Sequence, residues 1–206
     1  MAEALQSEVL QAAAEEHGSE TVQDPRIRRT RELLQQAFGR LLKEKDFDKI
    51  SVQDITDAAT VNRATFYLHY PDKFALLECK VAGDFHALLA SRGVTFDGTC
   101  SGALSNIVQG VCDFLTLTHG DRCERQLQME PHLEAAIVAV VRGMLLDGLQ
   151  RHPAPGTMPA AIRAAATASA VLGAAREWSR RPDREPSETF CTAAAAMIVP
   201  LLHGAA

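Results

Sequence analysis

Aromatic residues, closely spaced cysteines and long apolar runs are scarce in this sequence of 206 residues. Only 5% of the residues are aromatic, while Ala and Leu are abundant, which favours helices over sheet. No apolar run approaches the roughly 18 residues that a membrane-spanning helix needs, and the acidic, Ala-rich N-terminus lacks the pattern of a secretory signal. The composition therefore predicts an all-α, cytoplasmic protein without a membrane segment.

The cysteines exclude two further classes of protein. Their number is odd and no two form a Cys-x-x-Cys pair, so the sequence has neither a disulfide framework nor a zinc-finger pattern; they are Cys79, Cys100, Cys112, Cys123 and Cys191. The middle three are spaced by about 11 residues, with His119 between two of them, which is wider than usual metal-ligand spacing. We expect reduced thiols, no metal site and no cofactor.

The net charge of −5 is divided unevenly along the chain. Residues 1–23 hold five acids and no Lys or Arg, residues 24–80 hold eleven basic and nine acidic residues, and residues 81–206 hold ten basic and twelve acidic residues. The middle segment therefore carries a positive excess of two. So small an excess does not by itself identify a nucleic-acid-binding protein.

Helix signals begin after an acidic extension at residues 1–23. Asp24-Pro25 is an N-cap followed by proline at the first helical position, and apolar residues recur at helical spacing from there to about Lys45. Beyond residue 80, apolar stripes run through 104–115 and 133–144. An Ala-rich helix is expected at about 159–180, and Ser187 can cap a last helix. No strand pattern or internal repeat is present.

The first of two closely spaced helix starts lies at Ser51. Ser51 is a good N-cap, and Asp54 completes a capping box with it. Ile50 and Ile55 lie where a hydrophobic staple would close over this cap. The pattern predicts a two-turn helix at about 52–59.

The second start follows eleven residues later, where Asn62 is the cap and Val61 and Phe66 form the staple. The turn at Thr60-Val61 between the two helices is tight, and Pro71 ends the second helix. Two short helices joined by such a turn form a helix-turn-helix unit. Its recognition helix, at about 63–70, would be about 12 Å long and could cross a DNA major groove.

This recognition helix has an inward and an outward face. At about 100° per residue, Phe66 and Tyr70 share the inward face. The outward face carries a small residue, a leucine, two flanking hydroxyls and a leading arginine, which are Ala64, Leu68, Thr65, Tyr67 and Arg63. Lys73 follows at the start of the next helix, which Asp72 caps and where backbone N–H groups also favour a phosphate.

The sequence here resembles the DNA-binding signature of the tetracycline-repressor (TetR-like) family. The similar segments are 51–55, 58–70, 72–73 and 75–77, within a match that covers about residues 26–80. The match is specific because a Thr-Phe-Tyr-x-His-aromatic run ahead of a lysine is uncommon elsewhere. The chain departs from the family at Thr60, where glycine is usual, and a β-branched residue at positive φ is unfavourable.

The resemblance implies a sequence-specific, DNA-binding transcriptional regulator, a homodimeric repressor that a small apolar effector releases from a palindromic operator. Residues 24–80 would be the helix-turn-helix DNA-binding domain, and residues 81–206 the helical effector-binding and dimerisation domain. Phosphate contacts are implied for the positions of Ser51, Tyr67, His69 and Lys73. Base contacts are implied for the positions of Arg63, Ala64, Thr65 and Leu68. Gln53 and Asn62 complete the predicted DNA-binding set.

The dimer interface and the effector pocket are expected beyond residue 80. Small residues in the last two helices would let helix axes approach closely across a two-fold axis; they are Ala164, Ala165, Ala168, Gly173, Ala193 and Ala194. Apolar area would come from Leu172, Met197, Ile198 and Leu201. The polar groups of a largely apolar pocket would be His86, Gln109, Asp113 and Trp178.

Two other classes of function stay open. A helix-turn-helix factor without a small-molecule effector is the nearer alternative, and release of operator DNA by an added small molecule would exclude it. An all-helical enzyme is the more remote one. The sequence contains no His-Glu-x-x-His and no Glu-x-x-His pair of the di-iron bundles. The run 98–102 has the outline of a nucleophile elbow but lacks a persuasive preceding strand, so no catalytic residue is predicted.

Overall fold

The computed structural model describes residues 24–97, 101–119, 129–153 and 158–203. Within these ranges the chain forms eight α-helices, one short 3₁₀ helix and no strand, which confirms the all-α prediction. The elements are α2 (Pro25–Glu44), η1 (Phe47–Lys49), α3 (Val52–Ala59), α4 (Arg63–His69), α5 (Lys73–Ser91), α6 (Ser101–His119), α7 (Glu130–Arg151), α8 (Ala160–Arg180) and α9 (Ser187–His203). The predictions for residues 1–23, Cys100 and Cys123 fall outside the described residues.

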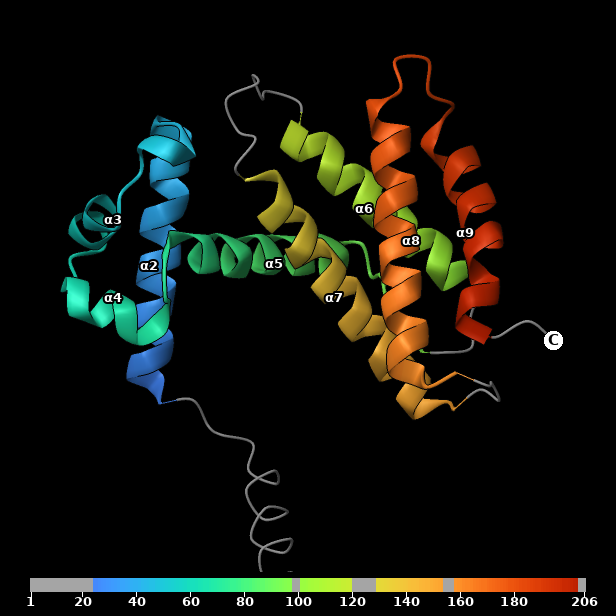
Figure 1. Ribbon diagram of the computed structural model, residues 1–206, viewed down its shortest axis with the longest axis horizontal. Helices are drawn as coiled ribbons and strands as arrows, with labels where there is room; N and C mark the ends of the chain where they lie inside the picture. Colours follow the sequence, from blue (N-terminus) through green and yellow to red (C-terminus); the bar gives the residue numbers. More distant parts are fainter. Residues whose placement is uncertain (1–23, 98–100, 120–128, 154–157, 204–206) are drawn as a thin grey trace, which may run out of the picture.

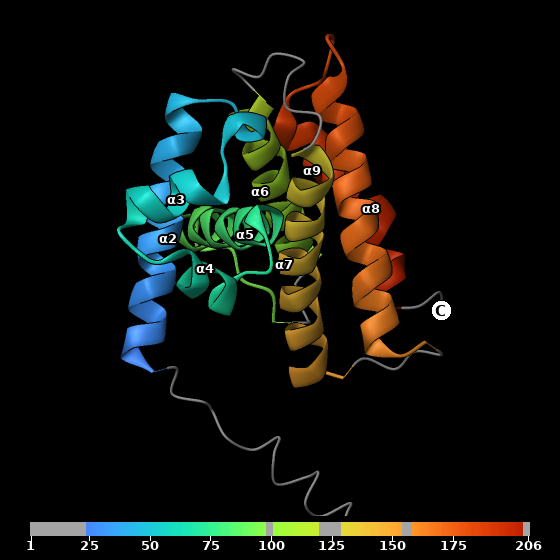
Figure 2. The same ribbon diagram turned by 60° about the vertical axis from the view of Figure 1, so that its left-hand side comes forward.

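Helix α5 joins two groups of helices. In Figure 1 it runs horizontally from α2, α3 and α4 on one side to α6, α7, α8 and α9 on the other. Figure 2 shows the same arrangement with the α2–α4 group turned forward. The predicted domain boundary at residue 80 lies inside this helix, which is continuous from Lys73 to Ser91. Any movement of α5 therefore involves both groups.

The predicted helix starts in the first group are present. The Asp24 carboxylate accepts a hydrogen bond from the Arg26 backbone N–H at 2.9 Å, with Pro25 as the first helical residue. The Asp72 carboxylate accepts from the Ala75 N–H at 2.8 Å. Between these caps, α2 buries Leu34 and Phe38 completely, as its helical spacing predicts.

The second group is a bundle in which α7 packs against α5 and α8, and α9 packs against α6 and α8. Small residues on α8, including Ala164 and Ala168, are fully buried there and allow close packing. Within the described residues, no helix is both long and apolar enough to span a membrane.

Two expectations for the last helices need correction. Leu172 and Ile198, predicted as dimer contacts, are buried inside the chain itself, because the apolar stripes of α8 and α9 face the bundle. The small residues Ala164, Ala168 and Ala194, expected at the same interface, are buried there as well. Of the four apolar residues proposed for the interface, Met197 and Leu201 are exposed, at 69% and 43%. Ser187 is the first residue of α9 rather than its cap.

Candidate DNA-binding surface

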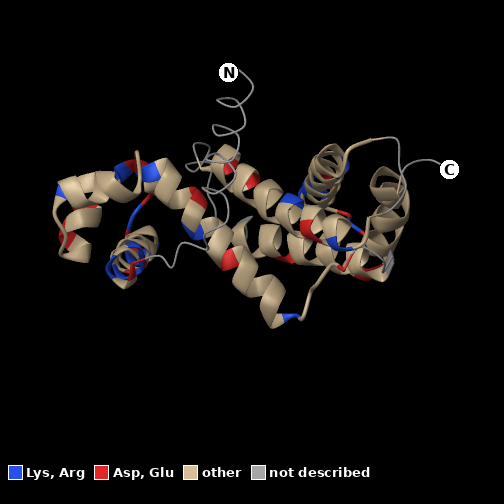
Figure 3. Cartoon of the chain, turned by 90° about the horizontal axis from the view of Figure 1, so that it is seen from below, with Lys and Arg blue, Asp and Glu red and all other residues tan. Residues whose placement is uncertain are grey.

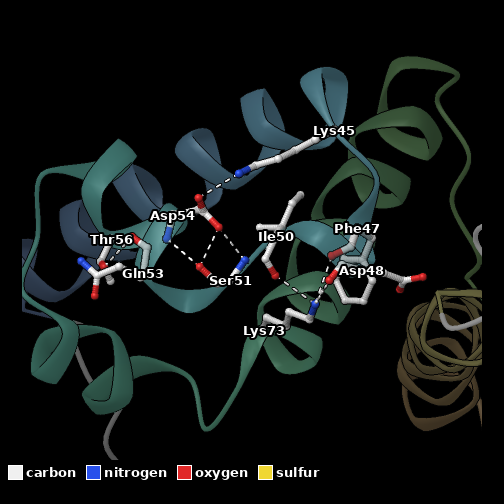
Figure 4. Close-up of polar contacts among 9 residues, drawn as sticks. All are labelled: Lys45, Phe47, Asp48, Ile50, Ser51, Gln53, Asp54, Thr56 and Lys73. Carbon is white, nitrogen blue, oxygen red and sulfur yellow. Dashed lines mark hydrogen bonds and ion pairs between the residues drawn. The ribbon is translucent and has the colours of Figure 1, made fainter.

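The start of α3 is held by a capping box (Figure 4). The Asp54 backbone N–H donates to the Ser51 hydroxyl at 3.1 Å, and the Ser51 N–H donates to the Asp54 carboxylate at 2.8 Å. The Lys45 ammonium, at the C-cap of α2, donates to the same carboxylate at 2.8 Å. The hydrogen bonds from Lys45 and then from Ser51 hold the pKa of the Asp54 carboxyl well below its usual range. The sequence predicted the box but not the lysine.

The turn between α3 and α4 has left-handed backbone at Thr60, with φ 56° and ψ 44°. The Val61 N–H donates to the Thr56 carbonyl at 3.0 Å, which is the six-to-one bond of a Schellman motif. Glycine would adopt this conformation without a Cβ penalty. The chain therefore keeps the predicted tight turn in spite of its β-branched residue.

Helix α4 separates a buried face from an exposed one, as predicted. Asn62 caps the helix through a bond of 2.6 Å from the Ala64 N–H to its side-chain oxygen. Phe66 is completely buried and Tyr70 nearly so, whereas Leu68 is 83% exposed. Ala64 is exposed as well. Leu68 is thus a large apolar side chain that is exposed to solvent on a short helix. It lies on the face that would meet the floor of a DNA groove.

Polar groups flank this exposed face. The Arg63 guanidinium donates to the Tyr67 hydroxyl at 3.2 Å and lies 5.6 Å from the centroid of that ring. Thr65 is half-buried beside them. On α3, exposed Gln53 donates to the Asp57 carboxylate at 2.7 Å.

His69 is the basic residue in the last turn of α4. Burial, and then the positive charge of Arg31, lower the pKa of the His69 imidazole from its ordinary value of 6.5. The shift favours the neutral form of the ring. In that form the ring can offer DNA a neutral hydrogen bond rather than a positive charge.

Lys73 has partners inside the chain. Its ammonium donates to the carbonyl oxygens of Phe47 at 3.0 Å and Ile50 at 2.9 Å, and lies 3.5 Å from that of Asp48 (Figure 4). It also lies 4.3 Å from the centroid of the Phe47 ring. This engagement differs from the predicted phosphate contact, because a phosphate would have to replace these carbonyls. The 3₁₀ helix η1 was not predicted from the sequence, where its signal was the apolar Phe47 between Asp46 and Asp48.

Helix α2 brings further positive charge to this unit. It holds six basic and two acidic residues. Figure 3 shows the Lys and Arg residues of the whole chain in blue and the Asp and Glu residues in red. Arg26, Arg28 and Arg29 in its first turns are exposed. The Arg40 guanidinium donates to the Ala58 carbonyl at 3.1 Å and so links α2 to the end of α3.

The four predicted pocket residues lie on three different helices, α5, α6 and α8. His86 is exposed on α5. Asp113 pairs with Arg92 and accepts a hydrogen bond from Gln109 at 3.0 Å. Trp178 is buried, where it stacks on Phe190 and donates to the Glu185 carbonyl at 3.1 Å. None of the four lines the cleft described below.

The capped pair α3–α4, with one buried and one exposed face on the second helix, defines a helix-turn-helix DNA-binding protein. Residues 33–78 match the family described as bacterial regulatory proteins, tetR family. The helix-turn-helix segment of this chain therefore matches the DNA-binding region of this family, which confirms the resemblance seen in the residues.

Several known proteins are similar to this chain or to part of it. An uncharacterised helix-turn-helix transcriptional regulator, YxbF of Bacillus subtilis, is 48% identical over 59 residues, which cover 28% of this chain and 16% of that protein. The solved structure of Thermus thermophilus FadR, a TetR-family repressor in complex with lauroyl-CoA, has a TM-score of 0.51 at 15% identity. That match covers 84% of this chain and 94% of the FadR chain, and it shows a shared fold. A TetR regulator from Streptococcus agalactiae is 24% identical over 87% of this chain and 99% of its own, with a TM-score of 0.46.

Proposed function

We propose that this regulator is a repressor that reads operator DNA with the outward face of α4. The observation that carries the proposal is the exposure of Leu68, opposite the completely buried Phe66. An exposed leucine on a short helix has no core to enter, and the methyl group of a thymine in the major groove would give it an apolar contact.

The remaining contacts follow from position on the surface. Base contacts are assigned to Leu68, Arg63, Ala64 and Thr65, which lie on the outward face or its edge. Phosphate contacts are assigned to Ser51, Tyr67 and His69, with Gln53 and Asn62 at the margin. Lys73 is left out of this set because its ammonium already binds backbone carbonyls.

The regulator is proposed to act as a two-fold dimer on a palindromic operator. Support comes from exposed apolar side chains on the last two helices, namely Met197 and Leu201 on α9 and Ile162 on α8. Exposed apolar residues gathered on neighbouring helices are typical of an interface. A two-fold dimer would place its two recognition helices about one helical turn of DNA, or a multiple of it, apart.

A small molecule is proposed to release the DNA. The support is mechanical, because α5 begins beside the helix-turn-helix unit at Lys73 and continues into the C-terminal core at Phe85 and Leu89. A ligand that displaces α5 from the core side would also displace α4. Coupling of this kind is typically worth about 1–3 kcal/mol.

Selection from random DNA at fixed salt tests the DNA-reading part. The wild type should enrich a palindrome, and Leu68→Ala should change the preference at one position of each half-site by about 1–3 kcal/mol. Leu33→Ala is the matched control, since Leu33 is also an exposed leucine, at 40%, but lies on α2 and outside the proposed DNA contacts. An unchanged motif for Leu68→Ala would show that the outward face does not read bases.

A further inference from the structure

A cleft of about 810 Å³ lies between the two groups of helices. Its walls come from α2 on one side and from α6 and α7 on the other, with α5 between them. Figures 1 and 2 show α2 standing apart from α6 and α7, with α5 crossing from one to the other. The cleft is therefore shared by the DNA-binding unit and the C-terminal bundle, and it is separate from the predicted pocket residues.

The floor of the cleft is apolar. Leu77 on α5, Leu133 on α7 and Met129 just before α7 line it, and each is nearly completely buried. Phe114 on α6 adds an aromatic wall, and its ring lies 5.1 Å from that of Phe85 by centroid. Such a floor would release water on contact with an apolar body, which favours binding in proportion to the area covered.

The rim of the cleft is basic. Lys43 on α2 is exposed, and no ion pair or hydrogen bond joins its ammonium to any acid among the described residues. The two carboxylates at the rim are already engaged, Asp84 by Lys80 and Glu32 by Arg28. The charge that remains free to meet a ligand is thus positive.

We propose that this cleft binds a small organic anion with an apolar body, and that it is the effector site of the repressor. The inference rests on the proposed function, because an effector site has meaning only if the protein binds and releases DNA. The apolar body lies on Leu77, Met129 and Leu133, and its acidic group meets Lys43.

The position of the cleft explains how such a ligand would act. The cleft is bounded by both groups of helices, so its volume changes with the spacing between α2 and α7. A ligand that fills the cleft stabilises one spacing between α2 and α7. Operator DNA bound by both helix-turn-helix units of a dimer also stabilises one spacing. Arg40 also lines the cleft and holds the Ala58 carbonyl at the end of α3, so an anion that attracts Arg40 acts directly on the helix-turn-helix unit.

A filling substitution tests the location. Gly83 lines the cleft, and a Cβ built on it has no atom within 4 Å, so Gly83→Trp places a large side chain there without a backbone clash. Gly143→Trp is the matched control, because Gly143 is also an exposed helical glycine with nothing within 4 Å of its Cβ, and it lies outside the cleft. The probe is 1-anilinonaphthalene-8-sulfonate, whose fluorescence rises in apolar surroundings. Gly83→Trp should weaken one-to-one binding at least tenfold, and Gly143→Trp should leave it unchanged.

A neutral analogue tests the ligand class. N-phenyl-1-naphthylamine has the same ring system without the sulfonate. Lys43→Gln should lower the affinity for the sulfonate probe by about two- to fivefold, as for an exposed charge pair. The affinity for the neutral probe should not change. Lys49→Gln, at an exposed lysine outside the cleft, should affect neither probe. Equal losses for the two probes in Lys43→Gln would overturn the preference for an anion.

The affinity for the selected operator with and without the sulfonate probe completes the test. Weaker DNA binding by the wild type, but not by Gly83→Trp, supports the effector role. Probe binding that Gly83→Trp does not reduce overturns the site. Probe binding in the cleft with unchanged affinity for the operator overturns the effector role alone. A wild type that enriches no DNA motif refutes the proposed function, and the probe measurements on the cleft still stand.

Discussion

The ammonium of Lys73 donates a hydrogen bond to the carbonyl oxygen of Ile50 at 2.9 Å. This bond ties the first residue of α5 to the segment that leads into α3. The contact continues through Phe47 to Phe74, whose rings meet edge to face at 5.3 Å, and from Phe74 to His132 on α7, stacked at 4.6 Å. A chain of direct contacts therefore connects the helix-turn-helix unit to the C-terminal bundle.

Lys73→Met should destabilise the protein without changing how its DNA affinity depends on salt. Methionine keeps an unbranched stem but leaves the carbonyls of Phe47 and Ile50 without their donor, and hydrogen bonds to a charged group are worth about 1.5–3 kcal/mol. Urea unfolding measures the loss. Lys49→Met is the control, at an exposed lysine paired only with Asp46 among the described contacts. Its free energy of unfolding should stay within about 0.5 kcal/mol of the wild-type value.

The salt slope separates this internal role from a phosphate contact. Removal of one phosphate contact lowers the slope of log affinity against log salt by about 0.9. Unchanged stability of Lys73→Met together with such a fall would restore the contact first predicted from the sequence.

Thr60→Gly should stabilise the protein by up to about 1.5 kcal/mol. Left-handed backbone costs an L-residue about 1–2 kcal/mol, and glycine removes that cost while it loses about 0.5–1 kcal/mol through its greater freedom in the unfolded chain. The urea midpoint should rise. Thr60→Val retains the β-branch at the same backbone angles and should show no gain; a gain equal to that of glycine would contradict this account of the turn.

Asp54→Asn should remove a pH-dependent contribution to stability. The folded state lowers the pKa of Asp54 from its ordinary value of 3.8, so the carboxylate stabilises the fold above that pH and the contribution is lost as the pH falls below it. The difference in unfolding free energy between wild type and Asp54→Asn should be full at pH 7 and smaller at pH 3. Asp57→Asn, on the same helix and bound by Gln53, is the control. A difference that grew on acidification would reverse the assigned sign.

Leu201→Arg should convert the proposed dimer into monomers. Leu201 is 43% exposed on α9 beside Met197, and an arginine there would bring like charges together across a two-fold axis. Sedimentation equilibrium gives the mass. Leu33→Arg is matched in exposure, at 40%, but lies on α2, and it should remain dimeric. A Leu201→Arg protein that sediments as the dimer would place the interface elsewhere.

The sequence determined by itself where the helices of the DNA-binding unit begin and which face of α4 is buried. Ser51, Asp54 and Asn62 act on backbone groups within three residues of themselves, so their caps depend on local chemistry alone. The burial of Phe66 opposite Leu68 follows from helical periodicity in the same way. The boundaries of α3 and the turn at Thr60 were predictable for this reason.

Only the tertiary structure decided which side chains meet across the chain. The apolar stripes of α8 and α9 showed that Leu172 and Ile198 would be buried, but a stripe does not specify whether its partner is the same chain or a second copy. Lys73 likewise found its partners more than twenty residues away, because η1 folds back onto the start of α5. The cleft likewise depends on contacts between elements that are far apart in the sequence. Its walls come from α2, α5, α6 and α7, and their spacing is set by packing along the whole length of α5, which no local pattern in the sequence records.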